Sequence, residues 1–64
     1  MKNDVRLLRT IAALTQEELA MKVGVTRQTI ISIEGGRYDP SLELALRLGR
    51  ILGKPIESIF HLEG

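Results

Sequence analysis

Residues 14–37, LTQEELAMKVGVTRQTIISIEGGR, contain two short helical patterns that a single glycine separates, and this stretch limits most strongly what the chain can fold into. Thr15 and Glu18 have the spacing of a capping box, which predicts that a helix begins between them. Gly24 tolerates the left-handed backbone of a tight turn between two helices. Thr26 is placed as the N-cap of the second helix. The stretch therefore predicts two short helices, over residues 16–23 and 27–34.

Apolar spacing and helix-ending residues place the other elements. Ser41 can cap a helix, Gly53 can end it, and Pro55 suits the first position of a last short helix. We expect one all-α domain over residues 1–64, with a helix-turn-helix at about 16–34. The five helices should span residues 5–13, 16–23, 27–34, 41–52 and 55–60.

Apolar residues at spacings of three and four define the expected core. With 64 residues and no cysteine, the chain is near the lower limit for folding alone. The expected core contains Leu8, Ile11, Leu19, Ala20, Val23, Val25, Ile30, Ile33, Leu44, Ala45, Leu48, Leu52, Ile56 and Ile59.

The composition argues against several classes of function. The chain has no cysteine, and its only histidine, His61, has no acidic cluster at ligand spacing, so we expect no metal and no cofactor. A P-loop, a nucleophile elbow and a paired-carboxylate pocket are all missing, so we expect neither an enzyme nor a small-molecule binder. The N-terminus lacks an apolar signal region and no apolar run could span a membrane, which predicts a cytoplasmic protein.

The helix over residues 27–34 carries polar side chains that a core cannot use. A merely solvated face usually favours Glu and Lys, whereas Thr and Ser are weak helix formers. In a helix-turn-helix the second helix lies in the major groove of double-stranded DNA, where arginine suits guanine and glutamine suits adenine. This pattern predicts DNA contacts from Thr26, Arg27, Gln28, Thr29 and Ser32. Two alternatives stay open: an ordinary solvated face, and a surface cation at Arg27 with Glu34 nearby.

The charge of the chain gives little support to a general electrostatic attraction to DNA. The net charge is +1, and the cations within residues 15–38 are balanced by as many carboxylates. Binding would therefore depend on a few well-placed groups. Gln16 and the amides at the start of its helix are placed for a phosphate, because a helix N-terminus favours anions. Gln16 could also be only the first residue of a helix, and Tyr38 could pack on the helix over 41–52 instead of reaching a phosphate.

The segments LTQEELA, VGVTRQTI, IEGGRY, PSLELALRLGRIL and PIESIF together resemble the Cro/C1-type (XRE family) helix-turn-helix regulators, over nearly the whole chain. The likeness is greatest to short stand-alone members of the dimeric cytolysin repressor type. It implies a five-helix, lambda-repressor-like fold and a homodimeric transcriptional regulator of a near-palindromic operator. Some short relatives add a ribbon from both chain ends, so MKN and FHLEG are expected to pair as two brief strands. Repression is expected over activation, because no second domain is apparent.

The resemblance also implies roles for single residues. Base contacts would come from Gln16, Arg27, Gln28 and Ser32, and contacts to the DNA backbone from around Thr26, Arg37 and Tyr38. Arg9 and Glu34 would form a structural ion pair, with independent solvated charges as the alternative. Ile31 departs from the family pattern, in which many members carry a polar residue there. An antitoxin or a protein-interaction module with the same fold is the alternative function.

The helix over residues 41–52 is apolar around most of its circumference, more than one buried face requires. Such a surplus predicts a contact surface on the outer side of this helix, on the last helix and on the tail. We expect a two-fold symmetric homodimer there, which would set two recognition helices about 34 Å apart, one turn of DNA. The expected contact residues are Leu46, Phe60 and Leu62. A monomer whose helix is buried on two sides is the alternative.

Overall fold

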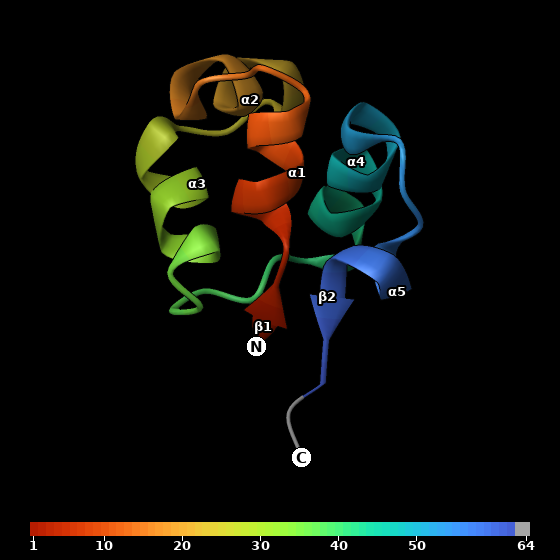
Figure 1. Cartoon of the computed structure of the whole chain (residues 1–64). Coiled ribbons are helices and arrows are strands. Elements are labelled where there is room, and N and C mark those ends of the chain that lie inside the picture. Colours follow the sequence, from red (N-terminus) through yellow and green to blue (C-terminus); the bar gives the residue numbers. More distant parts are fainter. Residues whose placement is uncertain (63–64) are drawn as a thin grey trace.

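The computed structural model describes residues 1–62, which form five helices and a two-stranded antiparallel ribbon (Figure 1). Helices α1 and α2 lie at the centre and top of the view, α3 at one side, and α4 and α5 at the other. The expected all-α class with a terminal ribbon is confirmed. The elements are β1 (Lys2–Asn3), α1 (Val5–Ile11), α2 (Gln16–Val23), α3 (Arg27–Glu34), α4 (Leu42–Leu52), α5 (Ile56–Ile59) and β2 (Phe60–His61).

The helix-turn-helix forms through the capping residues that the sequence predicts. The Thr15 hydroxyl accepts a hydrogen bond from the Glu18 amide at 3.0 Å, and the Glu18 carboxylate accepts from the Thr15 amide at 2.8 Å. Gly24 ends α2 with a φ of 82°, in the left-handed region that glycine adopts without strain. Arg47 of α4 donates through Nη1 to the Val23 carbonyl at 3.3 Å and so holds the end of α2. Both ends of α2 are therefore fixed, one by its capping box and the other at the turn.

The bounds of three helices differ from those expected. α1 ends at Ile11 and not at residue 13, because Ala13 has a φ of 60° and the chain turns away from the helix axis. Ser41 lies outside α4 as its cap, with its hydroxyl 3.2 Å from the Leu44 amide. Pro55 is likewise the cap of α5, and Phe60 leaves that helix because it belongs to β2.

The ribbon joins the two ends of the chain. Lys2 pairs with His61 and Asn3 with Phe60. Of the expected strand FHLEG only the first two residues are in β2, and residues 63–64 lie outside the described part of the chain. The Asn3 side-chain amide also donates to the Ile33 carbonyl at 2.8 Å, so the ribbon holds the C-terminal end of α3.

The prediction of the core is wrong at one residue, Ile11. Ile11 is 71% exposed, and Val5 of the same helix is fully buried in its place. Val5 is fully buried and Leu8 is half-buried, whereas Leu7 and Ile11, one helical turn apart, lie on the part of α1 that points to solvent. Leu8, Val25 and Leu52 are half-buried and pack against the core, and Ile56 is half-buried. The buried apolar residues are Val5, Leu19, Ala20, Val23, Ile30, Ile33, Leu44, Ala45, Leu48 and Ile59.

None of the helices within residues 1–62 has the length and apolar character needed to cross a membrane.

Candidate nucleic-acid interface

The N-terminal half of α3 exposes two long polar side chains side by side in the sequence. Ile30 and Ile33 are fully buried and fix the inner face of α3 against the core. Arg27 and Gln28 are exposed, and within residues 1–62 their side chains make no hydrogen bond or ion pair. The Glu34 carboxylate is held by Arg9 and Gln16 and makes no ion pair with Arg27, so the alternative of a surface cation at Arg27 stays open. Arg27 and Gln28 are thus available to an external partner.

Thr26, Thr29 and Ser32 on the same face of α3 are less available to an external partner than Arg27 and Gln28. The Thr26 hydroxyl accepts from the Thr29 amide at 3.3 Å and lies 3.1 Å from the Thr29 hydroxyl, so both side chains belong to the cap of α3. Thr26 is exposed, whereas Thr29 and Ser32 are half-buried. Their small side chains leave room for a close approach of a partner to the helix.

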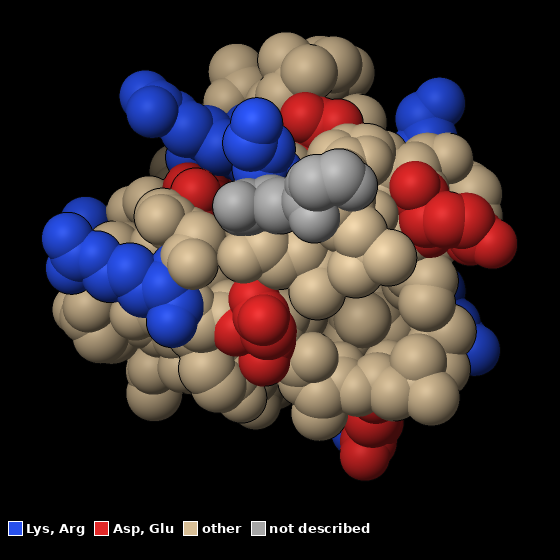
Figure 2. All heavy atoms as spheres, turned by 90° about the horizontal axis from the view of Figure 1, so that it is seen from below, with Lys and Arg blue, Asp and Glu red and all other residues tan. Residues whose placement is uncertain are grey.

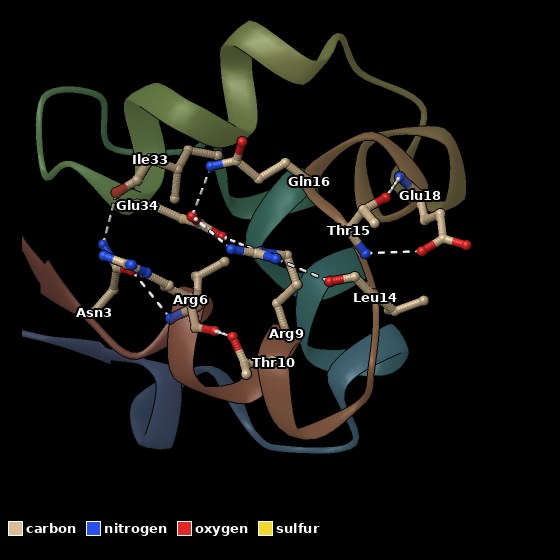
Figure 3. Close-up of polar contacts among 11 residues, drawn as sticks. Asn3, Arg6, Arg9, Thr10, Leu14, Thr15, Gln16, Glu18, Ile33 and Glu34 are labelled. Carbon is tan, nitrogen blue, oxygen red and sulfur yellow. Dashed lines mark hydrogen bonds and ion pairs between the residues drawn. The ribbon is translucent and has the colours of Figure 1, made fainter.

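Gln16 starts α2 and points toward the end of α3 (Figure 3). Its Nε2 donates to Glu34 Oε1 at 3.1 Å. The two residues line an open hollow of about 510 Å³ between α1, α2 and α3. The other residues that line the hollow are Arg6, Arg9, Thr15, Ile31 and Gly35.

Arg9 and Glu34 form the expected ion pair, and it is largely buried. Arg9 Nε donates to Glu34 Oε2 at 2.6 Å and Arg9 Nη2 to Glu34 Oε1 at 3.3 Å. The side chains are 14% and 6% exposed, so solvated independent charges do not describe them. Arg9 Nη1 also donates to the Leu14 carbonyl at 2.9 Å. The pair therefore connects α1, the segment before α2, and α3.

Arg37 and Tyr38 lie in the turn after α3. Gly36 has a φ of 75°, and the Arg37 amide donates to the Ser32 carbonyl at 3.0 Å, so the chain folds back at the end of the helix. Both side chains are exposed, and the Arg37 guanidinium makes no ion pair within residues 1–62. Their contact with a DNA backbone stays a prediction.

Two residues near the interface were not predicted from the sequence. Arg6 lines the same hollow as Gln16 and is exposed. It lies one helical turn before Arg9, so a comparison of helix faces would have found it. Asn3 bonds the last turn of α3, and its position in the ribbon gave no sign of that contact.

An apolar groove of about 470 Å³ lies between α4, α5 and the chain ends, away from α3. The end of the molecule seen in Figure 2 shows mainly uncharged atoms, with Lys and Arg prominent on the left, the side of α3 in Figure 1. Leu46 is 55% exposed and Leu62 is 89% exposed, whereas Phe60 is half-buried and packs on the core. The groove is lined by Met1, Pro40, Leu42, Ala45, Ile56, Glu57 and Phe60.

His61 lies against Asp4, with Nε2 and Oδ2 2.9 Å apart. No group of three His, Cys, Asp or Glu within residues 1–62 could hold a metal ion.

A five-helix bundle that presents the second helix of a helix-turn-helix defines a class of DNA-binding transcription regulators. The helix-turn-helix family model matches residues 5–59, and the chain belongs to this family, the Cro/C1-type helix-turn-helix regulators. It is 54% identical over 63 residues to an uncharacterized HTH-type transcriptional regulator of Methanocaldococcus jannaschii, covering 98% of this chain and 96% of the relative. The family is one of DNA-binding transcription regulators and not of enzymes.

Two further comparisons agree with this assignment. The cryptic phage CTXphi transcriptional repressor RstR of Vibrio cholerae is 36% identical over 55 residues, which is 86% of this chain and 50% of RstR. The crystal structure of the restriction-modification controller protein C.AhdI from Aeromonas hydrophila is similar with a TM-score of 0.79 and 34% identity. The similarity covers 88% of this chain and 85% of that protein.

Proposed function

We propose that this chain is a sequence-specific repressor that binds a palindromic operator as a homodimer, with α3 in the major groove. The observation that carries the proposal is the pair Arg27 and Gln28, exposed and unpartnered within residues 1–62 at the start of a helix whose other face is buried. The N-terminal residues of a recognition helix are those that contact base edges. The name of RstR, a transcriptional repressor, supports repression.

The other polar residues of the interface have supporting roles in this proposal. DNA phosphates on either side of α3 would be contacted by Arg37, by Tyr38 and by Gln16 at the hollow. Such phosphate contacts set the register of a protein on DNA. Thr26, Thr29 and Ser32 would lie close to the bases at the groove. A small set of contacts is consistent with the net charge of +1, which gives no strong general attraction to DNA.

Base-contact variants test the proposal. A duplex selected from a random pool by the unmodified chain serves as the probe, in a gel-shift or anisotropy titration. Arg27→Ala and Gln28→Ala should each weaken binding by about 1 to 3 kcal/mol and relax the preference at one base position. Arg37→Ala should weaken binding to all duplexes alike and reduce the salt dependence, because a phosphate contact carries no sequence information.

Some outcomes contradict the assignment. If neither Arg27→Ala nor Gln28→Ala alters binding to the selected duplex, α3 is not the recognition helix. A sequence-selective loss on Arg37→Ala contradicts its contact with a phosphate. If the purified chain shifts no duplex in the absence of another protein, the antitoxin or interaction module is the better description, with the apolar groove as its contact surface.

A further inference from the structure

The Glu34 carboxylate lies between Arg9 of the largely buried ion pair and Gln16 at the start of α2 (Figure 3). Each of its two oxygens has a donor: Oε2 takes Arg9 Nε, and Oε1 takes both Arg9 Nη2 and Gln16 Nε2. Arg9 is the stronger partner, since both groups of its 2.6 Å contact are charged, whereas the Gln16 amide is neutral and lies 3.1 Å away. The position of the carboxylate is therefore fixed by Arg9, and Gln16 is placed by the carboxylate.

We infer that Glu34 is a positioning residue for DNA binding, which acts through Gln16 and not by touching DNA. A primary amide nitrogen carries two hydrogens. Gln16 Nε2 donates one of them to Glu34, and the other is left for an anion at the rim of the hollow. Fixing the side chain in the free protein removes the entropy that a mobile glutamine would lose on binding. This inference rests on the proposed function.

The alternative is that Glu34 only stabilises the fold through Arg9. The two roles predict opposite effects of removing the charge. A carboxylate near DNA repels phosphates, so a purely structural Glu34 would leave DNA affinity unchanged or increased in a folded Glu34→Gln variant. A positioning Glu34 predicts weaker binding. A glutamine there has one acceptor oxygen, which Arg9 takes, and its NH2 group then faces Gln16 Nε2, donor against donor.

The test is a double-mutant cycle in DNA affinity, with the duplex selected by the unmodified chain and with folding checked by circular dichroism. Glu34→Gln and Gln16→Ala should each weaken binding by about three- to tenfold, the size of one hydrogen bond. The double variant should bind no more weakly than Gln16→Ala alone, because both changes remove the same contact. Arg27→Ala in the same assay reports on the proposed function by itself.

The outcomes separate the two ideas. Unchanged or tighter binding by Glu34→Gln, or additive losses in the double variant, overturn the positioning role, while a loss on Arg27→Ala keeps the proposed function. If the random pool yields no enriched duplex, the proposed function fails and the positioning role fails with it.

A second measurement needs no variant of Glu34. In the unmodified chain labelled with nitrogen-15, the Gln16 side-chain amide should be rigid, with protons that exchange more slowly than those of Gln28. Gln28 is the matched control, since it is exposed and makes no side-chain hydrogen bond within residues 1–62. A Gln16 amide as mobile as that of Gln28 would overturn the inference even if Glu34→Gln does not fold.

Discussion

At the scale of single residues, the capping box of α2 makes stability depend on pH. Hydrogen bonds to the backbone and side chain of Thr15, with a smaller effect of Lys22, hold the pKa of Glu18 below its usual value. A lowered folded-state pKa means that the stabilisation is complete above the ordinary glutamate pKa, about 4.3, and is lost as pH falls through the lowered value. Chemical unfolding between pH 7 and pH 2 should show this loss.

Glu18→Gln is the matched control for that prediction. Glutamine at this position of a capping box can still accept from the Thr15 amide but does not titrate. The free energy of unfolding of the native chain should therefore decrease relative to that of Glu18→Gln as the pH falls below about 4.3. Parallel pH profiles for the two chains would contradict the role given to Glu18.

A second residue-scale prediction concerns Gly49, which is buried within α4. A Cβ at this position would lie 2.8 Å from the Lys54 carbonyl oxygen, so the backbone after α4 would have to move. We expect Gly49→Ala to reduce the free energy of unfolding by about 1 to 3 kcal/mol. Gly35→Ala is the control, with ordinary right-handed backbone and its nearest contact at 3.4 Å, and should be neutral or stabilising. Equal losses in both variants, measured by urea unfolding, would contradict this account.

At the scale of elements, the apolar residues of α1 spread over more of its circumference than the core can cover, and the sequence does not determine which of them are buried. The structure buries Val5 and exposes Ile11, because Arg9 lies on the Val5 face and must reach Glu34. Val5→Ala should lower the free energy of unfolding by about 2 kcal/mol, and Ile11→Ala should change it by less than about 0.5 kcal/mol. Thermal unfolding monitored by circular dichroism measures both. A larger loss at Ile11 would contradict the observed packing.

The caps, the turn and the polar face could be predicted from the sequence because each depends on local chemistry. Thr15, Gly24 and Thr26 impose their conformations on their immediate neighbours. The features that the sequence did not predict depend on long-range contacts or on a backbone conformation that is unusual for the residue type. The early end of α1 depends on a left-handed Ala13, a conformation usually given by glycine. The bond between Gln16 and Glu34 joins residues 18 positions apart, and no local pattern encodes it.

At the scale of the whole molecule, the two surfaces of the proposed function lie on different sides of the bundle (Figure 1). α3 lies at one side, and the apolar groove of α4 and α5 lies at the other. Two copies joined through their grooves would carry their α3 helices on the outer sides of the dimer, and a palindrome requires the two helices to be about 34 Å apart, one turn of DNA. One protomer could read one half of a palindrome and its partner the other half.

This arrangement predicts that a charge at Leu46, one helical turn after the groove residue Leu42 on α4, separates the protomers without unfolding them. Leu46 is 55% exposed in the single chain, so Leu46→Lys should fold, but a dimer would bury its ammonium group against apolar atoms. The dimer dissociation constant should increase by about tenfold or more. Ile11→Lys adds the same charge at an exposed site outside the groove and should leave the dimer intact.

Sedimentation at micromolar concentration tests this prediction, because it measures the mass of the species in solution. The native chain and Ile11→Lys should sediment at twice the monomer mass of 7.1 kDa, and Leu46→Lys should shift toward 7.1 kDa. In the proposed dimer each protomer reads one half-site, so Leu46→Lys should also lose the advantage of a full palindrome over a single half-site. A native chain that sediments as a 7.1 kDa species and binds a half-site as tightly as the palindrome would contradict the dimer and leave α3 as a monomeric DNA reader.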